Sequence, residues 1–164
     1  MYTTITVEQI LDRKGYNVWS IDANAQVYMA LQMMADKNIG ALLVIENSKP
    51  AGIFSERDYA RRLVLKGKNE HDTPVKEIMT EPIIAIKLDQ KMEACLALMT
   101  EKRIRHLPVV DQDRQIIGII SIGDVVKEIT AEQTFIIDQL IQYIAGENRK
   151  PPVPKKIELH IHNE

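Results

Sequence analysis

The sequence predicts an α+β protein made of two pseudo-symmetric units that pack face to face, each with the order strand, helix, strand, strand, helix. The first observation behind this prediction is an internal repeat: residues 18–46 align with residues 83–111 at an offset of 65 (83 − 18 = 65). The second is that each copy alternates helical apolar stripes with short β-branched runs. The third is the composition, since 45% hydrophobic and 27% charged residues are typical of a globular protein.

The first unit is expected at residues 15–70, after an N-terminal helix within residues 1–14 that begins at Thr6, a good N-cap residue. Its first helix is predicted by apolar residues at helical spacing, namely Val27, Ala30, Leu31 and Met34. The β-branched run 41–45 and the stretch 52–54 are separated by a polar turn, which predicts a strand hairpin.

The second unit is expected at residues 82–131, after a linker at 71–81, and repeats the same order. The stripe of its first helix consists of Met92, Cys95, Leu96 and Met99, which we interpret as core residues. The runs 107–110 and 116–120 predict its hairpin. A unit of ~50–60 residues has too little apolar surface to be stable alone, so we expect the two units to cover each other.

The C-terminal part is expected to add an amphipathic helix within residues 132–148, whose apolar positions lie in the stretch 134–147. Residues 149–164 are interpreted as a Pro-rich linker followed by a terminal strand or tail. His160 and His162 in this tail have no cysteine or carboxylate partner at metal-ligand spacing, so no metal site is predicted.

Charge and cysteine content restrict the class of protein. The net charge is −2, which does not favour binding to nucleic acid or to an acidic membrane surface. The single cysteine cannot form an internal disulfide, which fits a reducing compartment. The first residues, MYTTITVEQ, contain no apolar signal-peptide core, and no apolar run is long enough to span a bilayer. We therefore expect a cytoplasmic protein.

Two polar junctions recur where a strand leads into a helix. The first junction, residues 52–58, reads GIFSERD, and the second junction, residues 118–124, reads GIISIGD. Each carries glycine, serine and aspartate at the same spacing, in the pattern G-h-h-S-x-x-D, where h is apolar. A serine before a helix is a good N-cap, and an aspartate in the first turn complements the helix dipole. The pattern fits helix capping, ligand binding, or both at once.

The duplicated junctions, together with IRHLPVV at 104–110, resemble the tandem cystathionine-β-synthase (CBS) domain pair, and small stand-alone pairs in particular. The resemblance covers nearly the whole chain. It implies a sensor module that binds adenosine compounds such as AMP, ADP, ATP, S-adenosylmethionine or NAD, usually as a disc-like homodimer, and regulates a partner protein.

The residue types support a nucleotide site. A carboxylate can accept both ribose hydroxyls, and an arginine fork binds phosphate oxygens bidentately. The resemblance implies that each junction works with the opposite unit. The first predicted site then consists of Ser55, Arg57, Asp58, Ile84, Arg105 and His106. The second predicted site consists of Trp19, Ile39, Gly40, Ala41, Ser121, Gly123 and Asp124. Backbone groups of Trp19 and Ile84 would read the adenine edge.

The two predicted sites differ in charge. Because the arginines belong to the first, we expect it to prefer phosphorylated nucleotides, whereas the glycines of the second leave room for a bulky 5′ extension such as that of NAD. Arg61 and Arg62 are interpreted as a solvated helix face.

Two other functions remain open. An enzyme is disfavoured because the sequence contains no nucleophile elbow, Walker loop, zinc-protease motif or paired catalytic carboxylates. A scaffold that binds no ligand and acts through its dimer surface is the main alternative.

Overall fold

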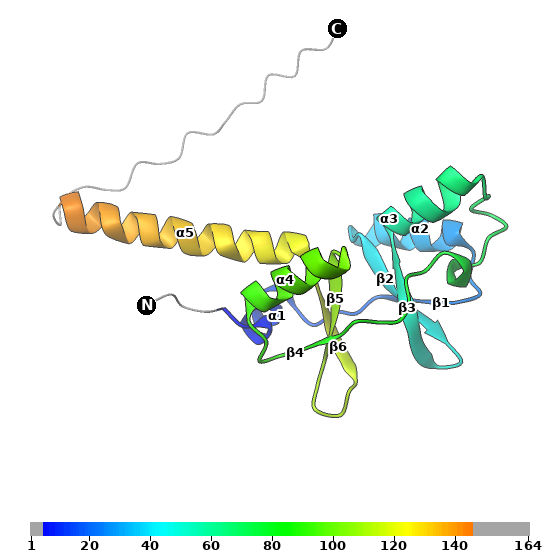
Figure 1. The fold of residues 1–164 in the computed structure, drawn as a ribbon, viewed down its shortest axis with the longest axis horizontal. Coiled ribbons are helices and arrows are strands. Elements are labelled where there is room, and N and C mark those ends of the chain that lie inside the picture. The colour runs from blue at the N-terminus through cyan, green and yellow to red at the C-terminus, as the bar shows by residue number, and fades with distance from the viewer. Residues whose placement is uncertain (1–4, 146–164) are drawn as a thin grey trace, which may run out of the picture. The chain divides into compact units, whose positions relative to one another are not determined.

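The computed structural model describes residues 5–145, and the chain divides after Val125 into two compact units. The first contains both copies of the repeat and confirms the predicted α+β class. Each copy has its own three-stranded sheet, in which the first strand runs parallel and the third antiparallel to the central one (Figure 1). The strands of the first sheet are β1 (Ser20–Asp22), β2 (Ala41–Glu46) and β3 (Lys49–Ser55), and those of the second are β4 (Ile86–Lys87), β5 (His106–Val110) and β6 (Ile116–Ser121).

The first helix of each copy forms where the apolar stripe predicted it. Helix α2 (Val27–Lys37) buries Val27, Ala30 and Met34, and helix α4 (Met92–Lys102) buries Met92, Cys95 and Met99. Both helices end in a residue with left-handed backbone geometry, Asn38 with φ 52° and Arg103 with φ 54°. The buried stripe fixes which face of each helix covers its sheet.

The helices after the two junctions differ. After the first junction the chain forms only α3 (Glu56–Asp58), followed by a π-helical turn η1 (Tyr59–Leu63) and a 3₁₀ turn η2 (Val64–Lys66). Leu63 is buried in this segment, and the neighbouring Arg62 donates hydrogen bonds to backbone carbonyls. π-Helical turns are rare and often accompany functional sites.

The second junction leads into α5 (Ile122–Ala145), a single helix of 24 residues. The helix after the second junction and the expected C-terminal helix are therefore one continuous helix, while the boundary at 131/132 between unit and extension stays a prediction. No glycine or proline occurs between residues 124 and 145, and the hydroxyls of Thr130 and Thr134 bond back to carbonyls of the preceding turn instead of capping a new helix. None of the described helices, α5 included, combines the length and apolar character needed to cross a bilayer. The terminal strand or tail at 149–164, with His160 and His162, lies outside the described residues.

A second repeat, which the sequence analysis missed, connects the two copies. Helix α1 (Val7–Lys14) begins with VEQIL, and the segment that contains η3 (Val75–Glu77) begins with VKEIM, at an offset of 68 (75 − 7 = 68). Thr6 caps α1 as predicted, through a capping box with Gln9. We call residues 5–11 and 73–79 the leading segments.

Each leading segment packs on the opposite copy. The backbone N–H of Val7 donates to Gln90 O at 2.9 Å, and that of Val75 donates to Ala25 O at 2.8 Å. Equivalent pairs on either side of these bonds are Glu8 N to Leu88 O with Lys76 N to Ala23 O, and Met92 N to Ile5 O with Val27 N to Thr73 O. The expected N-terminal extension and linker are therefore parts of the two cores, exchanged between the copies.

The exchanged segments explain the glycine of each junction. A Cβ atom on Gly52 would lie 2.7 Å from Met79 Sδ, and one on Gly118 would lie 2.8 Å from Leu11 Cδ1. Met79 and Leu11 occupy equivalent positions in the leading segments, and both are buried. Only glycine leaves enough room for this contact without rearrangement of the neighbour.

Candidate functional site

Both junctions form the predicted helix caps. At the first, Ser55 Oγ accepts from the Asp58 N–H at 3.3 Å, while Asp58 Oδ2 accepts from Ser55 N at 2.9 Å and from Ser55 Oγ at 2.8 Å. At the second, Ser121 and Asp124 repeat these bonds at 3.2, 2.7 and 2.9 Å. The reciprocal bonds use one carboxylate oxygen of each aspartate, so the other oxygen can serve a different partner.

At the first junction the other oxygen faces Thr80. Thr80 Oγ1 donates to Asp58 Oδ1 at 2.8 Å, and Arg62 Nε lies 3.7 Å from the same oxygen. The backbone of Thr80 is held by a β-bridge to Ile53, with hydrogen bonds of 2.9 and 2.7 Å. Asp58 is only 8% exposed. Sequence reasoning missed Thr80 because it lies in the expected linker.

A cavity of about 300 Å³ opens beside Asp58, between the two copies of the repeat. Its walls include all six residues of the first predicted site: Ser55, Arg57, Asp58, Ile84, Arg105 and His106. Gly40, assigned from sequence to the second predicted site, also lines this cavity. The volume is at the lower end of the range of small-molecule sites.

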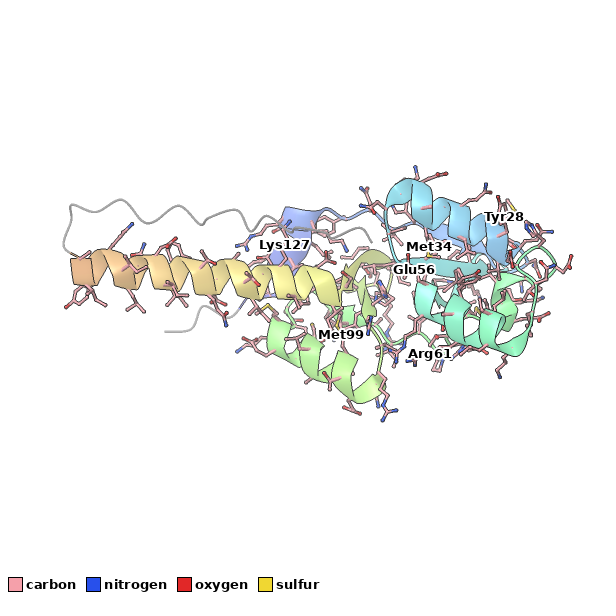
Figure 2. The ribbon with its side chains drawn as sticks, turned by 90° about the horizontal axis from the view of Figure 1, so that it is seen from above. Tyr28, Met34, Glu56, Arg61, Met99 and Lys127 are labelled. Carbon is pink, nitrogen blue, oxygen red and sulfur yellow. The ribbon has the colours of Figure 1, made fainter. Side chains whose placement is uncertain are left out.

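The cavity has a strongly cationic lining, which we call the cationic wall. Six positively charged side chains line it, against the two carboxylates of Glu56 and Asp58; they are Arg57, Arg61, Arg62, Lys102, Arg103 and Arg105. Glu56 and Arg61 are labelled in Figure 2 on the helical segment that follows β3.

One hydrogen bond and the mutual repulsion of the arginines characterise this cationic wall. Arg57 Nη1 donates to the carbonyl of Arg103 at 3.1 Å, which ties the two copies together. The pKa of Arg57 is lowered by desolvation and then by the positive charges of Arg61, Arg105 and Arg103. Like charges held this close favour an anion that would neutralise them.

Arg61 and Arg62 do not form a purely solvated face, as the sequence interpretation had it. Arg62 Nη1 donates to Met79 O at 2.6 Å, and both side chains line the cavity. The physical reason is their position after Asp58, since Arg62 follows it by four residues and its Nε lies 3.7 Å from Asp58 Oδ1.

The remaining walls are apolar. They are formed by Ile53 and Ile104 and by the extended segment before β4, with Pro82, Ile83 and Ile84. An apolar slot next to a carboxylate and a cationic wall matches the three parts of a nucleotide: base, ribose and phosphate.

His106 lies between the two junctions. It pairs with Ser121 across β5 and β6, and its Nε2 would be 3.5 Å from a Cβ on Gly40. Burial lowers the pKa of His106, and Lys14 and Arg105 lower it further, while Asp124 and Asp58 act in the opposite direction. His106 is therefore neutral at physiological pH and can donate or accept a hydrogen bond.

The second junction has a different partner. Lys14 Nζ, at the end of α1, donates to Asp124 Oδ2 and to Ile119 O, the latter at 2.8 Å. Burial alone would raise the pKa of Asp124, but the hydrogen bonds from Lys14 and Ser121 outweigh burial and keep this pKa below its ordinary value. Sequence reasoning missed Lys14 because the N-terminal helix was treated as a separate extension.

The rest of the second predicted site is less clearly assembled. The carbonyl of Trp19 accepts from Leu43 N at 3.0 Å within the first sheet, and Lys37 Nζ lies 4.2 Å from the centre of its ring. Ile39 packs on the first core, Ala41 is buried in β2, and Gly123 lies in the first turn of α5. Their grouping with Asp124 stays a prediction.

Residues 5–145 contain no cluster of three histidine, cysteine or carboxylate side chains that could hold a metal. Cys95 is buried, as predicted, and burial raises its pKa to about 11. His71 packs against the ring of Tyr28. None of these residues contributes to the cavity.

Comparison with known proteins agrees with this geometry. The CBS domain model matches residues 7–65 and 75–131. The mitochondrial CBS domain-containing protein CBSX3 of Arabidopsis thaliana is 35% identical over 155 residues, which cover 88% of this chain and 74% of that protein.

Solved structures show the same fold. A putative signal-transduction protein with CBS domains from Burkholderia ambifaria superposes with a TM-score of 0.75 at 46% identity, over 79% of this chain and 96% of that one. The CBS domain pair of protein MJ0100, solved in complex with 5′-methylthioadenosine and S-adenosyl-L-methionine, shares the fold at 24% identity and a TM-score of 0.68, over 79% of this chain and 98% of that one. The chain belongs to the CBS-domain family and carries two CBS domains.

Proposed function

We propose that this protein is a regulatory module that binds a phosphorylated adenosine compound in the cavity beside Asp58 and signals its presence to another protein. The observation that carries this proposal is the composition of that cavity, in which a buried carboxylate, an apolar slot and six cationic side chains surround about 300 Å³. A site with these three parts suits AMP, ADP, ATP or NAD.

The ribose is expected at Asp58. Its Oδ1 accepts from the hydroxyl of Thr80, and a ribose hydroxyl can replace or join that donor at small cost because both are neutral. The adenine ring would then lie against Ile84 and Ile104, and its edge would meet backbone groups of the extended segment at 82–85.

The phosphates are expected at the cationic wall. Arg57 and Arg105 come from opposite copies, so an anion bound to both would hold the copies together. Hydrogen bonds between ionised groups are roughly twice as strong as neutral ones. We therefore expect ADP and ATP to bind more tightly than adenosine.

A regulatory role fits the absence of a recognised catalytic motif in the sequence and the likeness to CBS-domain proteins. The pair in MJ0100 has been solved with two adenosine compounds, which supports ligands of this class for the fold.

The test uses calorimetric titration of ADP and adenosine into the wild type and the variant Arg105→Ala. Arg105 is an exposed side chain, so its removal should leave the fold intact. We expect the variant to lose roughly tenfold or more in ADP affinity, as for one charge-assisted bond, and little in adenosine affinity. The matched control, Lys49→Ala, removes an equal charge from an exposed position in the β2–β3 hairpin. Equal losses in both variants, or no binding to the wild type, would contradict the proposal.

A homodimer is the second part of the proposal, and α5 supports it. The helix leaves several large apolar side chains largely exposed, including Leu140 at 54%, Tyr143 at 88% and Ile144 at 81%. Of the twelve residues 134–145, only Asp138 is charged. An isolated helix of this composition is marginal in water, and a second copy would supply the matching apolar face.

Sedimentation tests this part. Leu140→Glu should shift the protein toward a monomer, whereas Gln139→Glu on the same helix should not. A wild type that is monomeric at all micromolar concentrations would rule the homodimer out.

A further inference from the structure

The two junctions share their helix caps and differ in the group that meets the carboxylate. At the first junction the hydrogen-bonding group is a neutral hydroxyl, Thr80 Oγ1 at 2.8 Å from Asp58 Oδ1, and the charged Arg62 Nε lies farther from the same oxygen, at 3.7 Å. At the second it is the ammonium of Lys14, which donates to Asp124 Oδ2 and to Ile119 O. In both cases the partner lies within three residues after the end of a leading segment.

The Lys14 contact is built into the fold. Helix α1 is fixed at its start by the capping box of Thr6 and Gln9 and by the hydrogen bond from Val7 N to Gln90 O. It is fixed along its length by Leu11, which is fully buried against Gly118 of the second junction. Helix α1 thus holds the ammonium of Lys14 against Asp124, while its other face packs in the core.

A ribose hydroxyl meets very different competitors at the two junctions. A hydroxyl–carboxylate bond can be exchanged for another of the same kind with little change in free energy. An ammonium bound to a half-buried carboxylate and to a backbone carbonyl must instead be separated from a charged partner. The ammonium shares Asp124 Oδ2 with the two Ser121 bonds, so a ribose that used both carboxylate oxygens would have to compete with it.

We propose that Lys14 closes the second junction to ribose, so that one chain binds one nucleotide, at the first junction. The inference rests on the proposed function and deepens it, because it makes Lys14 the residue that determines which of two pseudo-equivalent sites is used. It also replaces the expectation of a second, roomier nucleotide site at Gly123 and Gly40.

The opposite role for Lys14, binding a phosphate at an open second site, makes a contrary prediction. A phosphate-binding lysine would strengthen nucleotide binding at the second junction, and its removal would weaken it. A closing lysine does the reverse, so one substitution separates the two roles.

The experiment counts bound ADP per chain by calorimetry and native mass spectrometry in four proteins. The wild type is expected to bind one ADP. Lys14→Met should bind a second, with affinity at the second junction raised roughly tenfold or more, as for removal of one charge-assisted bond. Lys14→Met with Asp124→Asn should return to one, and Lys14→Arg, which keeps the positive charge, should behave as the wild type. Thermal melts check that each variant is folded, and Lys14→Gln replaces Lys14→Met if that variant is not.

Each outcome is decisive. A wild type that binds two ADP overturns the inference, and so does a folded Lys14→Met that still binds one. A wild type that binds none while Lys14→Met binds one through Asp124 contradicts the proposed site and supports the role of Lys14. Binding to neither protein overturns both proposals.

Discussion

Gly52→Ala is expected to destabilise the protein and to weaken the first junction at the same time. The new methyl group would lie 2.7 Å from Met79 Sδ and 2.8 Å from Thr80 O. The thioether of Met79 is flexible, but the carbonyl of Thr80 is backbone in a two-bond bridge to Ile53. Relief of the clash must therefore shift the bridge, whose two hydrogen bonds are each worth about 0.5–1.5 kcal/mol.

The expected loss is ~1–3 kcal/mol, in the range of overpacked cores. For a domain of this size a loss of 1 kcal/mol lowers Tm by roughly 2–4 °C. Because Thr80 also holds Asp58 Oδ1, the same shift should reduce the affinity for ADP.

Urea denaturation, a thermal melt and an ADP titration of the same preparations measure these effects. The control is Gly123→Ala, whose added Cβ would meet nothing closer than Ser121 Oγ at 3.5 Å. This change lies in the first turn of α5 and should be neutral or stabilising, by up to ~1 kcal/mol. If Gly52→Ala matched the control in both stability and affinity, the account of the junction glycine would be wrong.

Two further predictions concern buried titratable groups. Because burial lowers the pKa of His106 below that of the unfolded chain, the folded protein should lose stability as the pH falls below about 6.5, where only the unfolded state gains the proton. His106→Asn should flatten this part of the curve of unfolding free energy against pH, and an unchanged slope would shift the cause to the charged groups around it, namely Lys14, Asp58, Arg105 and Asp124. Cys95 is fully buried with a pKa of about 11, so a thiol reagent at pH 8 should label it only in urea, and rapid labelling of the native protein would contradict its core position.

Much of the fold could be predicted because the two copies of the repeat place apolar residues at equivalent positions. Met34 and Met99 occupy the same place in two helical stripes, and both are buried as expected. The same duplication identified the serine and aspartate of each junction. Physically, these positions are visible in sequence because helix period, strand composition and capping are local properties.

The residues that sequence reasoning missed depend on contacts between distant parts of the chain. Lys14 meets Asp124 across 110 positions. The match between VEQIL and VKEIM is five residues long and has its own offset, so it does not extend the longer repeat. The course of α5 was missed for a different reason, since Thr130 and Thr134 favour helix starts as well as bonds to the preceding turn.

The exchange of the leading segments determines how the chain can be divided. Trimming residues 5–14 would remove Val7, Ile10 and Leu11, which pack on the second copy of the repeat although they belong in sequence to the first CBS domain. Likewise, a fragment that begins after residue 80 would lack residues 5–11, which pack on its own sheet. Residues 73–79, which pack on the first copy, would stay with that copy. A chain with only one CBS domain could satisfy the same contacts by lending its leading segment to a second copy, as a domain-swapped dimer. The two halves of this protein are therefore interlocked, because each completes the core of the other.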